Sequence, residues 1–88
     1  MDIDLSKHKL ALTYPCLWDY KLIGKDEAAL RRAIHQVMGG LDHTVSFSNA
    51  SRTGKYCSLK VELTVQSEQQ RTDLYLAFKA SRDIILVL

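Results

Sequence analysis

The chain has little of what marks several large classes of protein. Its 88 residues include two cysteines, too few for a disulfide framework, and these do not form a C-x-x-C pair. Its longest apolar run, Ile84 to Leu88, is far shorter than the roughly 20 residues that a membrane-spanning helix needs. Asp2, Asp4, Lys7 and Lys9 exclude the apolar core of a secretory signal from the first twelve residues. We therefore expect a cytoplasmic protein with no membrane segment.

Charge and metal-ligand patterns are also sparse. A net charge of +2 is too small to indicate a polyanionic partner by itself. His8, His35 and His43 show no ligand spacing with the cysteines or with one another, so we expect neither a metal nor a cofactor. Gly54-Lys55 lacks the upstream glycine and the following Ser or Thr of a phosphate-binding loop.

Residues 1 to about 12 are polar and patternless, although Leu10, Leu12 and Tyr14 alternate and could extend the first strand. We expect a flexible or extended lead-in over residues 1–13, followed by a single domain over residues 14–88. The only proline, Pro15, suits the first residue of a strand. The alternation that follows predicts a strand with one face toward the core, formed by Cys16, Trp18, Tyr20 and Leu22. We interpret Trp18 and Tyr20 as packing residues.

Asp26 predicts a helix start, because its side chain can accept a hydrogen bond from a free amide of the first turn. Gly39-Gly40 predicts the end of that helix. Its core stripe is Leu30, Ala33, Ile34, Val37 and Met38.

The second half of the chain repeats these patterns. A strand near His43 to Asn49, with Val45 and Phe47 inward, precedes a turn and a cleanly alternating strand from Cys57 to Val65. Ser67 and Gln70 form a predicted capping box, in which each side chain satisfies the other residue's free amide. The helix that follows has the stripe Leu74, Ala77 and Phe78, and the last predicted strand is Ile84 to Leu88.

This order predicts an α+β fold, a ferredoxin-like βαββαβ sandwich. Right-handed crossovers place the first and third strands in the centre of a four-stranded antiparallel sheet of order 4-1-3-2, with both helices on one face. An open meander with helices at one end would leave a strand of each βαβ pair without its partner. In the sandwich, Cys16 and Cys57 lie at opposite ends, about 20 Å apart, beyond disulfide reach.

The topology brings four cations to one rim beside the start of the first helix: Lys25, Arg52, Lys55 and Arg82. Free helix amides, a glycine at Gly24 that gives a ligand access, and these charges favour a small anion. We therefore predict a ligand site from these five residues. A second predicted surface, for a protein partner, is the open sheet face with Leu17, Ile23, Tyr56, Ile85 and Val87.

Two motifs carry a family resemblance. Tyr-Pro-x-x-Trp-x-Tyr-Lys-x-x-Gly from Tyr14 to Gly24, with Ser-x-x-Gly-Lys-Tyr-x-Ser from Ser51 to Ser58, resembles the YbeD-like family of small bacterial proteins of unknown function. The resemblance covers nearly all of the chain after residue 13. It implies a ferredoxin-like fold similar to the ACT-type regulatory domains, which bind small metabolites in other enzymes, and it supplies no catalytic residues. Only Gly24 has an obvious counterpart among ACT-like features.

The hypothesis that we favour is a non-enzymatic regulatory or adaptor domain that binds a small anionic metabolite or a protein, as a monomer or as a weak homodimer through its last strand. RNA binding is a weaker alternative, because Tyr56 is the only clear exposed aromatic expected on the central strands. An acylphosphatase-like enzyme is weaker still: Gly24-Lys25 and the distant Asn49 match poorly its arginine-containing anion loop and water-positioning asparagine.

Overall fold

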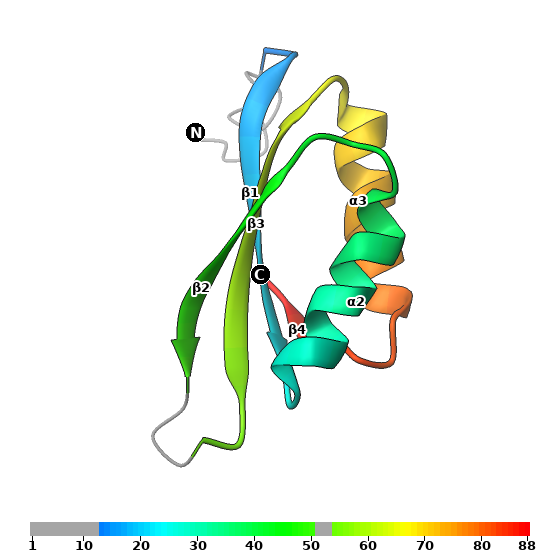
Figure 1. The fold of residues 1–88 in the computed structure, drawn as a ribbon. Coiled ribbons are helices and arrows are strands. Elements are labelled where there is room, and N and C mark those ends of the chain that lie inside the picture. The colour runs from blue at the N-terminus through cyan, green and yellow to red at the C-terminus, as the bar shows by residue number, and fades with distance from the viewer. Residues whose placement is uncertain (1–12, 51–53) are drawn as a thin grey trace, which may run out of the picture.

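A computed structural model describes residues 13–50 and 54–88, so most of the lead-in lies outside the described residues. The four strands form one antiparallel sheet of order β2-β3-β1-β4, with both helices on the same face (Figure 1). This confirms the predicted ferredoxin-like α+β sandwich. The elements are β1 (Cys16–Gly24), α2 (Glu27–Met38), β2 (Thr44–Ala50), β3 (Cys57–Val65), α3 (Glu68–Ala80) and β4 (Leu86–Val87).

The central pair of strands, β1 and β3, sets the core. Their register runs without a break from Cys16 opposite Val65 to Gly24 opposite Cys57. Even-numbered residues of β1 face the helices, and the buried side chains there include Tyr20 and Leu22. The same register puts the two cysteines at opposite ends of the pair, and both are free thiols, as the predicted topology requires.

Both helices begin at the predicted residues. Asp26 caps α2, and its side chain accepts a hydrogen bond from the Ala28 amide at 3.3 Å. The C-cap of α2 is Gly39, whose φ of 56° favours glycine. Ser67 caps α3 and accepts from the Gln70 amide at 3.1 Å, whereas the Gln70 side chain accepts from the Gln66 amide and not from Ser67.

The predicted packing differs from the structure in three details. Phe47 lies on the predicted, helix-facing side, opposite the buried Leu59, but 52% of it is exposed because β2 is an edge strand. Ala77 is also exposed, since α3 buries only the narrow stripe of Leu74 and Phe78. The last strand is restricted to Leu86–Val87, and Ile84 before it is buried in the core instead of pairing in the sheet.

Tyr20 ties the sheet to α3. Its hydroxyl donates to the Arg71 carbonyl oxygen at 2.6 Å, and its ring meets Phe78 edge-on with the centroids 5.2 Å apart. Burial raises the pKa of Tyr20 to about 12, and the nearby Arg71 charge opposes this only partly. The neutral phenol is therefore favoured in the folded chain.

Gly24 ends β1 in a place that has no room for a side chain. A Cβ added there would lie 2.7 Å from the Asp83 carbonyl oxygen and 3.2 Å from Leu30 Cδ1. The backbone after α3 can approach the end of β1 only because residue 24 is glycine.

We predict that Gly24→Ala lowers the free energy of unfolding by about 1–3 kcal/mol, because the methyl group overpacks a backbone contact. Gly40→Ala is the matched control: a Cβ there meets nothing within 4 Å and φ is not positive, so stability should stay equal or rise slightly. Urea unfolding of the two variants measures the difference. Equal midpoints for both would contradict the packing role of Gly24.

We predict that Tyr20→Phe costs about 1 kcal/mol at pH 7, through loss of the hydrogen bond to Arg71. The pKa of Tyr20 in the folded state is raised above its unfolded value near 10. The stabilisation that the protonated Tyr20 hydroxyl gives is therefore fully present below pH 10. That contribution is lost as the pH rises through about 12. Urea midpoints at pH 8, 10 and 11 should therefore converge for the two proteins. A difference that does not change with pH would contradict this prediction.

Candidate functional site

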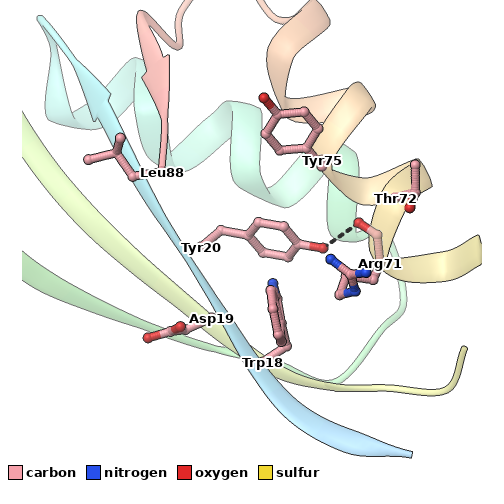
Figure 2. Close-up of a pocket in the computed structure, with 7 residues that line it drawn as sticks. All are labelled: Trp18, Asp19, Tyr20, Arg71, Thr72, Tyr75 and Leu88. Carbon is pink, nitrogen blue, oxygen red and sulfur yellow. Dashed lines mark hydrogen bonds between the residues drawn. The ribbon is translucent and has the colours of Figure 1, made fainter. Parts of the chain in front are cut away.

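A cavity of about 500 Å³ lies between β1 and α3. It sits beside the part of β1 that β4 does not reach, and Figure 2 shows the Tyr20 ring between Trp18 and Tyr75 with the Arg71 guanidinium close by. Three aromatic rings and one cation thus share one opening. The lining residues are Trp18, Asp19, Tyr20, Arg71, Thr72, Tyr75 and Leu88.

Arg71 is the charged centre of this cavity. Its guanidinium carbon lies 4.8 Å from the centre of the Trp18 ring, and its Nε donates to the Tyr14 hydroxyl at 3.0 Å. That hydrogen bond raises the pKa of Arg71, so the group stays cationic. Within residues 13–50 and 54–88, no carboxylate oxygen lies within 4.0 Å of it. The Trp18 ring and the Tyr14 hydroxyl fix the cation in place, and the Glu68 carboxylate adds an electrostatic contribution without forming an ion pair with it among the described residues.

The position of Arg71 follows from the periodicity of α3. It stands three residues before Leu74 and seven before Phe78, on the stripe that faces the sheet. Its amide also bonds the Ser67 carbonyl oxygen at 3.1 Å, in the first turn. Sequence reasoning missed Arg71 and with it Thr72 and Tyr75. The available signal was a cation on an otherwise apolar stripe.

The arrangement of the cavity suits an organic anion. A guanidinium has five N–H donors, and among the described residues only the Tyr14 hydroxyl accepts one from Arg71. A planar carboxylate can take two parallel hydrogen bonds from such a group. The rings of Trp18, Tyr20 and Tyr75 offer apolar area to the rest of the ligand.

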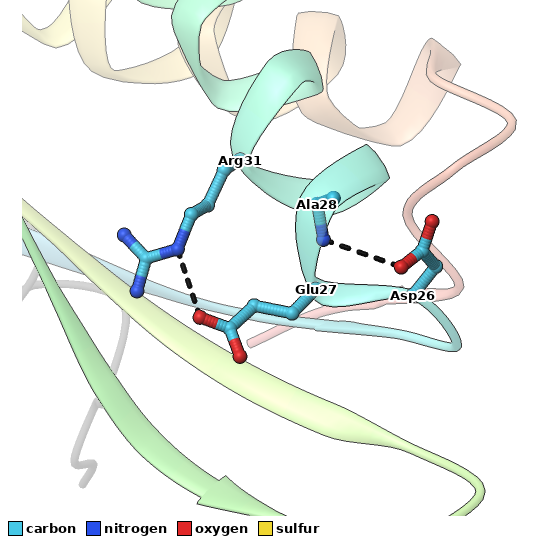
Figure 3. Close-up of polar contacts among 4 residues, drawn as sticks. All are labelled: Asp26, Glu27, Ala28 and Arg31. Atoms are coloured by element: carbon cyan, nitrogen blue, oxygen red, sulfur yellow. Dashed lines mark hydrogen bonds and ion pairs between the residues drawn. The ribbon is translucent and has the colours of Figure 1, made fainter.

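The structure brings together part of the basic rim that the sequence predicts. Lys25 and Arg82 line one small cavity of about 240 Å³, but Asp26 and Asp83 line it too. Two carboxylates there balance two cations, and Asp26 already occupies the start of α2, as Figure 3 shows.

Three further residues belong to the predicted rim site: Gly24, Arg52 and Lys55. Lys55 does not line it, and Arg52 lies outside the described residues. Gly24 is buried against the Asp83 carbonyl, which gives it a packing reason to be glycine. Anion binding at the rim stays a prediction with less support than the cavity at Arg71 has.

Some of the residues of the predicted partner surface are exposed on the open sheet face and others are not. Leu17 is 65% exposed, and Tyr56 and Ile85 are exposed as well, while Ile23 is half-buried. Val87 is a correction: it pairs with Leu22 and packs against the core on the helix side. Its neighbours Leu86 and Leu88 are exposed.

Other kinds of site are not evident in the part of the chain that the structure describes. There, no three His, Cys, Asp or Glu side chains are grouped so that they could hold a metal ion. None of the described helices has the length and apolarity to cross a membrane. Burial raises the pKa of the Cys57 thiol, with Glu27 and Asp26 adding to the effect, so its reactive thiolate form is disfavoured.

Comparison with known proteins supports the fold and gives the family. The solution structure of protein HP0495 from Helicobacter pylori matches with a TM-score of 0.77 at 22% identity, over 100% of this chain and 97% of that one. A second solution structure of HP0495, described as a hypothetical protein, matches with a TM-score of 0.63 at 24% identity, over 85% and 87% of the two chains.

Sequence relatives extend over similar lengths. An uncharacterized protein of Campylobacter jejuni, Cj0253, is 30% identical over 94% of each chain, and a UPF0250 protein of Pseudomonas syringae is 29% identical over 99% of this chain and 98% of its own. The model of a family described as protein of unknown function (DUF493) matches residues 9–88. The chain therefore belongs to the DUF493 family, the YbeD-like proteins that its sequence motifs resemble.

Proposed function

We propose that this chain is a cytoplasmic, non-enzymatic regulatory or adaptor domain that binds a ligand carrying a carboxylate in the cavity between β1 and α3. One observation carries the proposal. Arg71 is a half-buried cation, held on the Trp18 ring and by the Tyr14 hydroxyl, with no carboxylate within 4.0 Å among the described residues. Such a group gains most from an anion that arrives from outside the domain.

The cavity supports this function better than the predicted rim does. At the rim, Asp26 and Asp83 lie with Lys25 and Arg82, so an incoming anion meets charges of both signs. At Arg71 the surroundings are mainly aromatic, and a guanidinium is weakly hydrated enough to remain there. The ligand that fits is an organic acid or an acidic group on a larger partner, since a bare inorganic anion would leave the aromatic rings unused.

The proposal also assigns a binding and not a catalytic role to the titratable groups near the cavity. Tyr20 has its pKa raised to about 12 by burial, so it stays a hydrogen-bond donor to the Arg71 carbonyl at neutral pH. Its proton is already committed to the tie between β1 and α3. The remaining polar groups, Arg71 and Thr72, can bind and orient a carboxylate.

We predict that phenylacetate and hexanoate bind at the cavity and that phenylacetamide does not. In an amide chemical-shift titration, the Trp18 indole N–H and the amides of Arg71 and Thr72 should shift and saturate. Arg71→Gln should weaken binding by about tenfold or more, because it removes a charge-assisted hydrogen-bonding group.

Arg32→Gln is the charge-matched control, since Arg32 is exposed on α2, away from the lining of this cavity. It should leave the titration unchanged. A variant with both Lys25→Gln and Arg82→Gln tests the rim independently. If the acids shift only rim amides and this double variant alone abolishes the shifts, the proposal for Arg71 is wrong.

A further inference from the structure

Among the residues that the structure describes, β4 covers the outer edge of β1 for only part of its length. Lys21 and Leu88 exchange both backbone hydrogen bonds, at 3.1 and 2.8 Å, and the Ile85 amide donates to the Ile23 carbonyl oxygen at 2.7 Å. Odd-numbered residues of β1 therefore direct their backbone groups toward β4. The strand pairing with β4 covers only Leu22 and Ile23.

Beyond the Lys21–Leu88 pair, the next backbone groups on this edge belong to Asp19 and Leu17. Within residues 13–50 and 54–88, no strand pairs with them on that side. Each offers one N–H donor and one C=O acceptor, which an added strand can use. Figure 1 shows the C-terminal end of the chain partway along β1, where this open stretch begins.

The open edge and the cavity belong to the same opening. Trp18 lies between Leu17 and Asp19, whose outer backbone groups have no strand partner among the described residues. It turns its side chain to the helix side and under the Arg71 guanidinium. In an added antiparallel strand, the residue opposite Trp18 would point to that same side. Its two neighbours would form backbone pairs with Asp19 and Leu17.

We propose that the carboxylate ligand of this domain is an acidic side chain on an extended peptide segment, which adds to the sheet along β1 in the direction of β4. This inference rests on the proposed function and names its ligand class. The acidic residue lies opposite Trp18 and its carboxylate meets Arg71. The flanking residues pair with Asp19 and Leu17, over roughly 10 Å of strand.

The charge of Arg71 favours one kind of strand at this edge. The cation at Arg71 and the absence of a carboxylate within 4.0 Å of it, among described residues, favour an acidic segment. A second copy of the chain is disfavoured, because an antiparallel β1–β1 pair centred on Trp18 would bring two Arg71 cations to the same side of the joined sheet. The Asp19 side chain is no substitute for the ligand, since it points to the open sheet face, 4.0 Å from Lys60.

The test uses the full chain and the peptide acetyl-Val-Glu-Val-amide, in which valine favours the extended form. We expect saturable shifts at the amides of Leu17, Asp19 and Arg71 and at the Trp18 indole. Acetyl-Val-Gln-Val-amide, and the Glu peptide N-methylated at both valines, should each bind at least tenfold more weakly. The first lacks the charge and the second lacks the edge donors.

Leu17→Pro tests the edge from the side of the protein. The Leu17 N–H points to the outer edge of β1 and takes no part in the pairing of β1 with β3. Its removal by proline should therefore preserve folding. Leu17→Val keeps the N–H and is the matched control, because this side chain is mostly exposed. Peptide binding should weaken about tenfold in the proline variant and stay unchanged in the valine variant. If the proline variant does not fold, the N-methylated peptide gives the same comparison with the native chain.

The outcomes separate the two proposals. Binding of phenylacetate at Arg71, together with equal affinities for the methylated and unmethylated peptides, would overturn strand addition and leave the proposed function standing. If neither acids nor peptides bind, both proposals fail. Shifts at Leu17 and Asp19 that depend on protein concentration alone would show that a second copy occupies the edge, which would also overturn this inference.

Discussion

The unbroken register between β1 and β3 is the constraint on which the rest of the domain depends. Side chains alternate between the two faces of a sheet, so a slip of one residue would turn Leu22 out to solvent and Lys21 into the core. The same register sends the backbone groups of odd-numbered β1 residues to the outer edge and the side chain of Trp18 beneath α3. Core, open edge and cavity are therefore fixed by a single set of pairs.

On that framework, Arg71 is positioned by contacts that orient its charge without neutralising it. The attraction between a cation and an aromatic ring contributes about 0.5–2 kcal/mol. A buried ion pair with a carboxylate would cost more than this in desolvation. The guanidinium itself is only weakly hydrated, so its partial burial costs little. The Tyr14 hydroxyl uses one N–H, and no other described residue accepts a hydrogen bond from the guanidinium, so its other donors can serve a ligand. The end of the domain near Lys25 and Arg82 shows the opposite arrangement, in which Asp26 and Asp83 supply the counter-charges within the same small cavity.

The fold could be predicted from sequence because alternation in β1 and β3 and the caps at Asp26 and Ser67 are local signals that agree with the topology. The site could not. The main residue of the site, Arg71, lies in α3, and the sequence pattern of α3 predicts only an apolar stripe. The role of Arg71 on that stripe depends on its contact with the ring of Trp18, which is 53 residues earlier in the chain. The rim was predicted from topology, the charges of its side chains and the free amides of a helix start, and these do not show that Asp26 and Asp83 line the same cavity as Lys25 and Arg82 or that Lys55 is not among its lining residues.

The short β4 explains why an edge and a cavity coincide. Ile84 fills the core, so the segment reaches the sheet only near the end of β1. The outer edge of β1 before Lys21 therefore has no strand partner among the described residues, although its other edge pairs with β3. Exposed edges normally invite sheet-to-sheet aggregation, and proline or charge beside them limits it. Here Pro15 stands just before β1 and Asp19 lies within the open stretch, so only about three residues can pair. That length is too short for a stable sheet extension by itself, so binding there needs the added attraction of an acidic side chain to Arg71.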